Sequence, residues 1–167
     1  MTHSDTNTSI ELRGPILAAH RKFRQAIGSY SGEQKGRNVE ASMALRDNPN
    51  SMVSFQAMHS HLAAMCALGR AEEKFGKASA IPAEDQSIAG YIRSQQKMLD
   101  EEYNTALLNV AKSMGALLEE EPGTVGYRER ARLAAQEHGR LDGWSFALLT
   151  FHQAFEQVRA QAEALKN

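Results

Sequence analysis

Apolar residues in the last quarter of the chain recur at alternating intervals of four and three. This spacing places them on one stripe of an α-helix, with polar residues such as Gln153 and Glu156 on the opposite face. The stripe consists of Trp144, Leu148, Phe151, Phe155, Val158, Ala162 and Leu165. An apolar stripe must be covered by another helix, so the pattern predicts a fold built from packed helices.

Similar patterns predict helices in the first third of the chain. A helix is expected over residues 15–30, followed by a loop over 29–36, where Gly and Ser are frequent. A short helix over 38–46 follows, and its spacing predicts that Val39 and Met43 face inward.

The clearest break in the first half is the turn Asp47-Asn48-Pro49-Asn50. Either Asn50 or Ser51 is predicted to cap the next helix, which should run to about Lys77. The predicted inward stripe of this helix comprises Phe55, His59, Leu62, Met65, Cys66, Gly69 and Phe75.

Two long helical segments, 82–120 and 125–165, are joined by about four residues, with Thr124 as the predicted cap of the second. Short connections make antiparallel neighbours, so the two segments predict a long helical hairpin with a kink at Gly139–Gly143. The first segment would be roughly 57 Å long, whereas a compact chain of this size is only ~40 Å across. The predicted fold class is therefore all-α, an elongated antiparallel helical bundle built on the long hairpin.

The length of 167 residues fits one domain, with residues 1–8 as a flexible polar tail and 9–167 as a single helical bundle. Thr8 and Glu11 fit a capping box at the start of the first helix. The single cysteine, Cys66, fits a reducing compartment, so a cytoplasmic location is expected. Export by a contact-dependent bacterial secretion system is the alternative, because the N-terminus is polar and carries no secretory signal.

Charge and hydropathy bear on the expected partners. The formal net charge is -1 and the pI is about 6.6, so no nucleic-acid partner is expected. No apolar run approaches the ~18 residues of a membrane span. Basic residues near Arg21 and Arg130 are interpreted as solvated helix faces, because aromatic residues do not alternate with them.

The histidines lack the spacing of a metal site. His59 and His61 are two residues apart, which places them on different faces of a helix. His20 and His59 lie on apolar stripes and His152 flanks one, so a bundle that binds a ligand, metal or haem stays open as an alternative. The prediction is that the protein has no cofactor and no metal.

Arg132 and His138 are separated by five residues on one predicted helix. This spacing resembles the Arg-x4–6-His motif of small helical ribonucleases of the HEPN type, although Leu133 stands where that family usually has a polar residue. The resemblance covers seven residues and implies RNA cleavage by these two side chains as an alternative function.

Three acidic residues, Glu119, Glu120 and Glu121, crowd the C-terminal end of the first long segment. The helix dipole disfavours negative charge at this position by roughly 0.3–1 kcal/mol per residue. Arg128 and Arg130 follow just beyond the turn, so the cluster is either a local set of salt bridges or an acidic tip that docks a basic partner.

The absence of a recognisable catalytic motif and the excess of apolar surface favour a non-enzymatic helical interaction module. Such a module would act as a structural subunit, an adaptor or chaperone, or a secreted effector. The apolar stripe near the C-terminus has the narrow spacing of a coiled-coil seam, and neighbouring apolar residues widen it. The predicted interface with a protein partner or a second copy comprises Trp144, Phe146, Leu149, Phe151 and Phe155.

Overall fold

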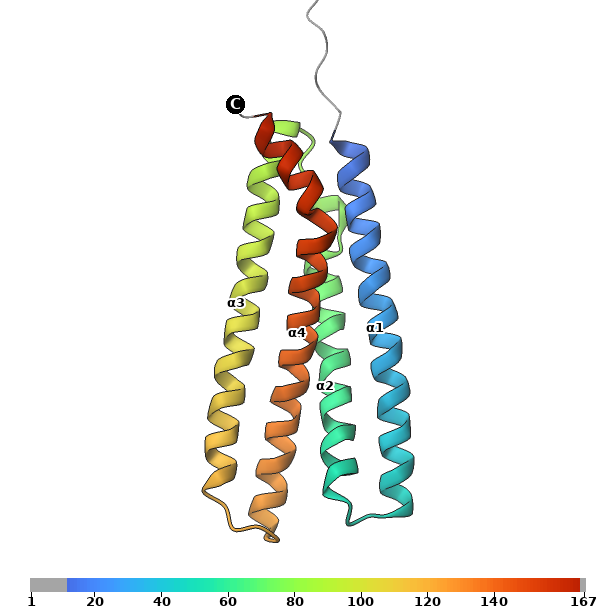
Figure 1. The fold of residues 1–167 in the computed structure, drawn as a ribbon, viewed down its shortest axis with the longest axis vertical. Helices are drawn as coiled ribbons and strands as arrows, with labels where there is room; N and C mark the ends of the chain where they lie inside the picture. Colours follow the sequence, from blue (N-terminus) through green and yellow to red (C-terminus); the bar gives the residue numbers. More distant parts are fainter. Residues whose placement is uncertain (1–11, 166–167) are drawn as a thin grey trace, which may run out of the picture.

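The computed structural model describes residues 12–165 and consists of four long helices packed into an elongated bundle (Figure 1). No strand occurs within these residues. The predicted fold class, an all-α elongated bundle on a long helical hairpin, is confirmed. The helices are α1 (Arg13–Asp47), α2 (Met52–Phe75), α3 (Asp85–Leu118) and α4 (Val125–Ala164), with a short 3-10 turn at Ala78–Ala80.

Consecutive helices run in opposite directions, so two loops lie at the same end of the bundle (Figure 1). These loops are residues 48–51 and 119–124. We call the half of the bundle nearest to them the loop half, and the other half, which holds the start of α1 and the end of α4, the terminal half. Helix α2 is shorter than the other three and ends before it reaches the terminal end of the bundle (Figure 1). Helix α4 packs against all three other helices, whereas α3 makes its extensive contacts with α4 alone.

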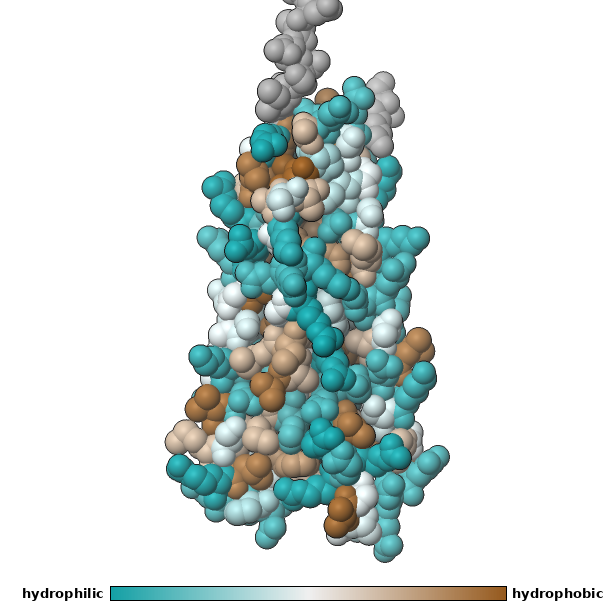
Figure 2. Space-filling model, turned by 180° about the vertical axis from the view of Figure 1, so that it is seen from behind, coloured by the Kyte–Doolittle hydropathy of each residue, from teal (hydrophilic) through white to brown (hydrophobic). Residues whose placement is uncertain are grey.

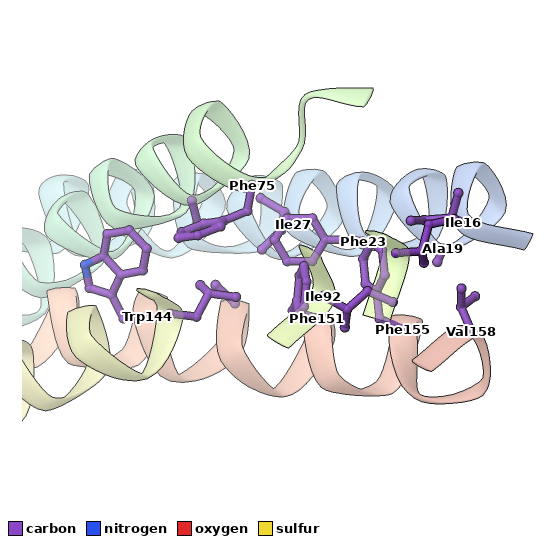
Figure 3. Packing of buried hydrophobic residues seen from close by; sticks show 14 of the residues in the cluster. Ile16, Ala19, Phe23, Ile27, Phe75, Ile92, Trp144, Phe151, Phe155 and Val158 are labelled. Atoms are coloured by element: carbon purple, nitrogen blue, oxygen red, sulfur yellow. The ribbon is translucent and has the colours of Figure 1, made fainter. Parts of the chain in front are cut away.

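The terminal half contains a core of large side chains, drawn in Figure 3. Phe151 stacks on Phe155 with ring centroids 4.2 Å apart, and Phe23 meets Phe151 edge to face. Burying one such side chain stabilises the fold by about 1.5–3 kcal/mol. The other large members include Ile16, Ile27, Ile88, Ile92, Leu99 and Phe75.

The loop half is held together mainly by small residues. Its separate cluster consists of Leu117, Ala131 and Ala134. Helices α2 and α4 approach closely at Gly139 and Gly143, where an added Cβ would lie 1.9 Å and 2.9 Å from backbone oxygens of α2. The loop half therefore gains close backbone packing but buries few large apolar side chains.

Both predicted caps adjacent to the loops are present. The Ser51 hydroxyl accepts a hydrogen bond from the Ser54 backbone N–H at 3.2 Å, and Thr124 accepts from Tyr127 N–H at 3.1 Å. Gly123 precedes the second cap with a φ of 89°, a left-handed conformation that glycine adopts without steric cost.

The predicted loop at 29–36 is wrong, because α1 is continuous through these residues. Gln34 is almost completely buried and Tyr30 stacks on Phe146 of α4 at 4.0 Å. These contacts offset the helix propensity lost at each glycine, about 1 kcal/mol. Val39 and Met43 are exposed rather than inward, and Ala41 is buried in their place.

The predicted inward stripe of α2 is wrong in its central part. Phe55 and Phe75 are buried as expected, but Leu62 is 48% exposed and Cys66 is also exposed. The buried row consists of Ala63, Ala64, Ala67, Leu68 and Ala71. Small residues face α4 because the two backbones lie too close together for larger side chains.

The predicted kink at Gly139–Gly143 is also wrong, because α4 is a single helix of 40 residues. Helix α3 begins at Asp85, three residues after Pro82, where the sequence predicted its start. Its buried residues include Ile88, Leu99 and Leu117. The tail at 1–8 and the capping box lie outside the described residues.

Candidate interaction surface

Three of the five predicted interface residues lie inside the chain's own core. Trp144 is 5% exposed, and Phe151 and Phe155 are each 1% exposed. Trp144 meets Phe75 of α2 edge to face, and Phe155 meets the ring of His20 in the same way. These side chains are covered within one copy of the chain, so an external partner would not reach them without opening the bundle.

The other two predicted interface residues lie nearer the surface. Phe146 is half-buried against Tyr30, whereas Leu149 is 55% exposed. Leu149 lines an open groove of about 460 Å³ between α3 and α4. The groove has a mixed lining of Gln96, Asp100, Tyr103, Ser145, Leu148, Leu149 and His152.

A second apolar stripe runs along the exposed side of α3. Its members Leu107, Ala111, Met114 and Leu118 follow the spacing four, three, four. We call these four residues the α3 seam. Leu107 is 45% exposed and Leu118 is 81% exposed, and Leu108, at 62%, lies beside them. This stripe was not predicted from the sequence. The signal for it is present there, as a second row of apolar residues beside the inward row of the same helix.

Most of the exposed large apolar side chains lie in the loop half, several of them on the rear face shown in Figure 2. The buried side chains of the same half are mainly alanines, so the usual preference of large apolar residues for the core is partly reversed there. The exposed residues of the loop half are Val39, Met43, Val53, Leu62, Leu107, Leu108, Met114, Leu118 and Val125.

The three acidic residues at the end of α3 differ in their exposure and in their contacts. Glu120 is half-buried and lies 3.9 Å from Arg130 in an ion pair, measured from Oε1 to Nε. Glu119 and Glu121 are exposed. The adjacent Arg128 lies over the ring of Phe55 at 4.2 Å rather than beside an acidic residue.

Arg132 and His138 lie on α4, as predicted, but the guanidinium of Arg132 is engaged elsewhere. Its Nε donates to the Glu129 carboxylate at 3.0 Å, and a second hydrogen bond joins Nη2 to the other oxygen. His138 is exposed. The imidazole near Arg132 is His59, whose pKa is lowered by burial and by the positive charge of Arg132.

His20 lies deep in the terminal half, 2% exposed. Its Nε2 forms a hydrogen bond with the Tyr91 hydroxyl at 3.1 Å, while its Nδ1 has no partner. Burial, followed by the charge of Arg24, lowers the pKa of His20, so the ring is neutral in the folded protein at pH 7. Within residues 12–165 no group of three or more His, Cys, Asp or Glu side chains is arranged to hold a metal ion.

A polar cluster joins α1, α2 and α4 in the middle of the bundle, and sequence analysis missed it. The Tyr30 hydroxyl donates to the Asp142 carboxylate at 2.8 Å, and burial together with this bond raises the pKa of Tyr30 to about 12. His61 Nδ1 forms a hydrogen bond with the side-chain amide oxygen Oε1 of Gln34 at 2.7 Å. The residues are far apart in the sequence, so no local pattern could have predicted the cluster.

None of the helices within the described part of the chain is long and apolar enough to cross a membrane. The chain matches no protein-family model, no curated protein and no solved structure.

Proposed function

We propose that the protein is a non-enzymatic helical interaction module that binds a protein partner or a second copy of itself. The apolar side chains of the loop half would form the contact surface. The observation that carries this proposal is the distribution of large apolar residues, with Leu108 and Leu118 exposed in the half whose core is built from alanines. Exposed apolar residues that gather in one region mark interaction sites more often than scattered ones do.

The polar residues support a structural rather than a catalytic role for the helices. Arg132 is held by Glu129, and Arg130 pairs with Glu120. His20 is enclosed by Tyr91 and Phe155, so a substrate would not reach its ring. These contacts hold the helices against one another. The exposed apolar surface of the loop half is then the feature that a binding partner would cover.

The proposal is tested with the full chain carrying Leu108→Glu and Leu118→Glu together. The matched control is Leu165→Glu, which alters an equally apolar side chain, 55% exposed, in the terminal half. Light scattering measures self-association, and affinity capture from the native source identifies partners. We expect association to be lost in the double variant and kept in the control, with helical content unchanged in both. If the wild type, the double variant and the control all associated equally, the proposal would be contradicted.

A further inference from the structure

His20 is a polar side chain inside the apolar core of the terminal half, and one of its ring nitrogens is unpaired. The residue is 2% exposed on α1. Its Nε2 is hydrogen-bonded to the Tyr91 hydroxyl of α3, while Nδ1 has no partner among the described residues. On the α4 side the ring meets Phe155 edge to face, with centroids 5.0 Å apart. A buried polar atom without a partner costs free energy, so its presence calls for an explanation.

The surroundings of His20 suit a neutral imidazole and oppose an imidazolium ion. Burial lowers the pKa of His20 most, and the guanidinium of Arg24, one turn further along α1, lowers it again. Arg24 itself pairs with Glu72 of α2 at 3.6 Å in an exposed salt bridge. Tyr91 keeps its proton, because burial raises the pKa of its phenol. A protonated His20 would therefore be a buried cation beside a second cation, with no acceptor at Nδ1.

The other ionisable groups of the helices around His20 do not compensate such a charge. On α3, Asp85 lies half-buried in the first turn, and on α4 Glu156 and Arg159 line a cleft towards α3. Within residues 12–165 no carboxylate raises the pKa of His20 or pairs with its ring. The other cations in the first part of α1 and beside Tyr91 are exposed, namely Arg13, Arg21, Lys22 and Arg93.

Helix α1 begins close to His20, and polar contacts contribute little to holding that end. The N-cap position is Leu12, whose apolar side chain cannot accept a hydrogen bond from the first helical N–H groups. Nothing lies within 4 Å of a Cβ at Gly14, so this glycine lowers the helix propensity without a gain in packing. Helices α1 and α3 make no extensive contact of their own, and the bond from His20 to Tyr91 joins them. The start of α1 is therefore the part of the bundle that can separate most easily.

We propose that protonation of His20 opens the start of α1, residues 13–23, away from α3 and α4 and leaves the loop half closed. In the open form the imidazolium ion reaches water, which removes the cost of a buried charge. Ile16 and Ala19 then no longer cover Phe155 and Val158, with which they share the core drawn in Figure 3. Acid would thus expose an apolar surface that is hidden at neutral pH.

The loop half holds no comparable group. Its contact between α2 and α4 at Gly139 and Gly143 is made by backbone and alanine atoms that do not titrate. His59, the histidine of this half with a lowered pKa, is only half-buried, so water can reach its ring without an opening of the helices.

The direction and the upper limit of the pH effect follow from one proton. The open form binds it with a pKa near the ordinary 6.5 and the closed form only at lower pH, so acid favours the open form. The equilibrium changes by at most about tenfold per pH unit below that value. A change from pH 7.5 to pH 5.5 therefore favours opening by up to about tenfold.

Hydrogen–deuterium exchange of the full chain, followed by mass spectrometry, tests the proposal, because amide exchange reports local opening. Protection factors are measured at pH 7.5 and pH 5.5 and corrected for the intrinsic exchange rate at each pH. We expect protection of residues 13–23 to fall by up to about tenfold at the lower pH, and that of residues 55–72 and 128–143 to stay the same. Equal protection of 13–23 at the two pH values would overturn the proposal. An equal fall in all segments would also overturn it, because the whole bundle would then be loosening.

Two substitutions assign the effect to one histidine. His20→Gln keeps a polar side chain but cannot take up a proton, so the fall in protection of residues 13–23 should disappear. His59→Gln is the matched control, since it removes a histidine with a lowered pKa from the loop half and should leave that fall intact. The opposite result, a fall kept in His20→Gln, would show that another group is responsible.

Tyr91→Phe provides a second test that does not require His20 to be replaced. It removes the hydrogen bond to Nε2 but leaves the ring able to bind a proton. We expect lower protection of residues 13–23 than in the wild type at pH 7.5, together with a further fall at pH 5.5. Loss of the further fall would contradict the role of His20. The inference goes beyond the proposed function, whose contact surface lies in the loop half, so either can fail while the other stands.

Discussion

Gly139 of α4 lies directly against the backbone carbonyl of Ser60 in α2. A Cβ added at Gly139 would stand 1.9 Å from the Ser60 oxygen and 3.0 Å from the Cβ of Ala63. No real Cβ atom tolerates the first of these distances, so the glycine is what allows the two parallel helices to approach. A second close approach of the same two helices occurs one turn further on, at Gly143.

Replacing Gly139 with alanine should therefore lower the free energy of unfolding by about 1–3 kcal/mol or more, because the helices must move apart. Chemical denaturation followed by circular dichroism measures the change. Gly28→Ala is the matched control, since nothing lies within 4 Å of a Cβ there. The control should stabilise the protein by roughly 0.5–1 kcal/mol through helix propensity. Similar effects of the two substitutions would contradict the close approach.

Phe151→Glu and Leu149→Glu should differ sharply although the residues are two positions apart. Phe151 is 1% exposed between Phe23 and Phe155, so losing the ring costs about 3–5 kcal/mol and the buried charge adds to this. We expect the Phe151 variant to unfold. Leu149 is 55% exposed, and its variant should stay within about 0.5 kcal/mol of wild type. Helical content and thermal unfolding midpoints measure both, and an unfolded Leu149 variant would place that side chain in the core.

Stability should fall as the pH drops below about 6.5. Burial lowers the pKa of His20, and Tyr91, Phe155 and the charged Arg24 surround its ring. Because the unfolded state binds a proton first, His20 contributes its full stability above the ordinary pKa of 6.5 and loses it as the pH falls towards the lowered value.

The loss is at most about 1.4 kcal/mol per pH unit for one histidine. His59 and His61 have lowered pKa values too, so they add in the same direction. Urea unfolding at a series of pH values between about 7.5 and 5 measures the slope. His20→Gln should flatten it. An equal slope in wild type and His20→Gln would show that His20 does not couple folding to protonation.

The shape of the molecule gives a prediction that needs no variant. Helix α4 has 40 residues, which corresponds to roughly 60 Å, and it runs along the whole bundle (Figure 1). Small-angle scattering should therefore give a radius of gyration clearly above the ~15 Å of a compact chain of this length. Measurement at several concentrations is required, because a dimer would also raise the value. A compact value at the lowest concentration would be inconsistent with the extended bundle.

The sequence by itself determined the class of fold and much of its helical content. The four-three spacing from Trp144 onwards identified a helix whose members Phe151 and Phe155 are core residues. The turn before Ser51 and the cap at Thr124 were predicted because short-range hydrogen bonds define them. Such features depend on neighbours within a few residues, and the sequence displays those neighbours directly.

Only the tertiary structure decided which apolar residues are covered and which helices are continuous. Gly139 and Gly143 suggested a kink, but the backbone of α2 packs against them and α4 continues as one helix. The α3 seam has the same four-three spacing as the buried stripe near the C-terminus, yet Leu118 is 81% exposed. Periodicity identifies an apolar face but not its partner, because the partner is chosen by the closest backbone approach and by contacts between residues distant in the chain.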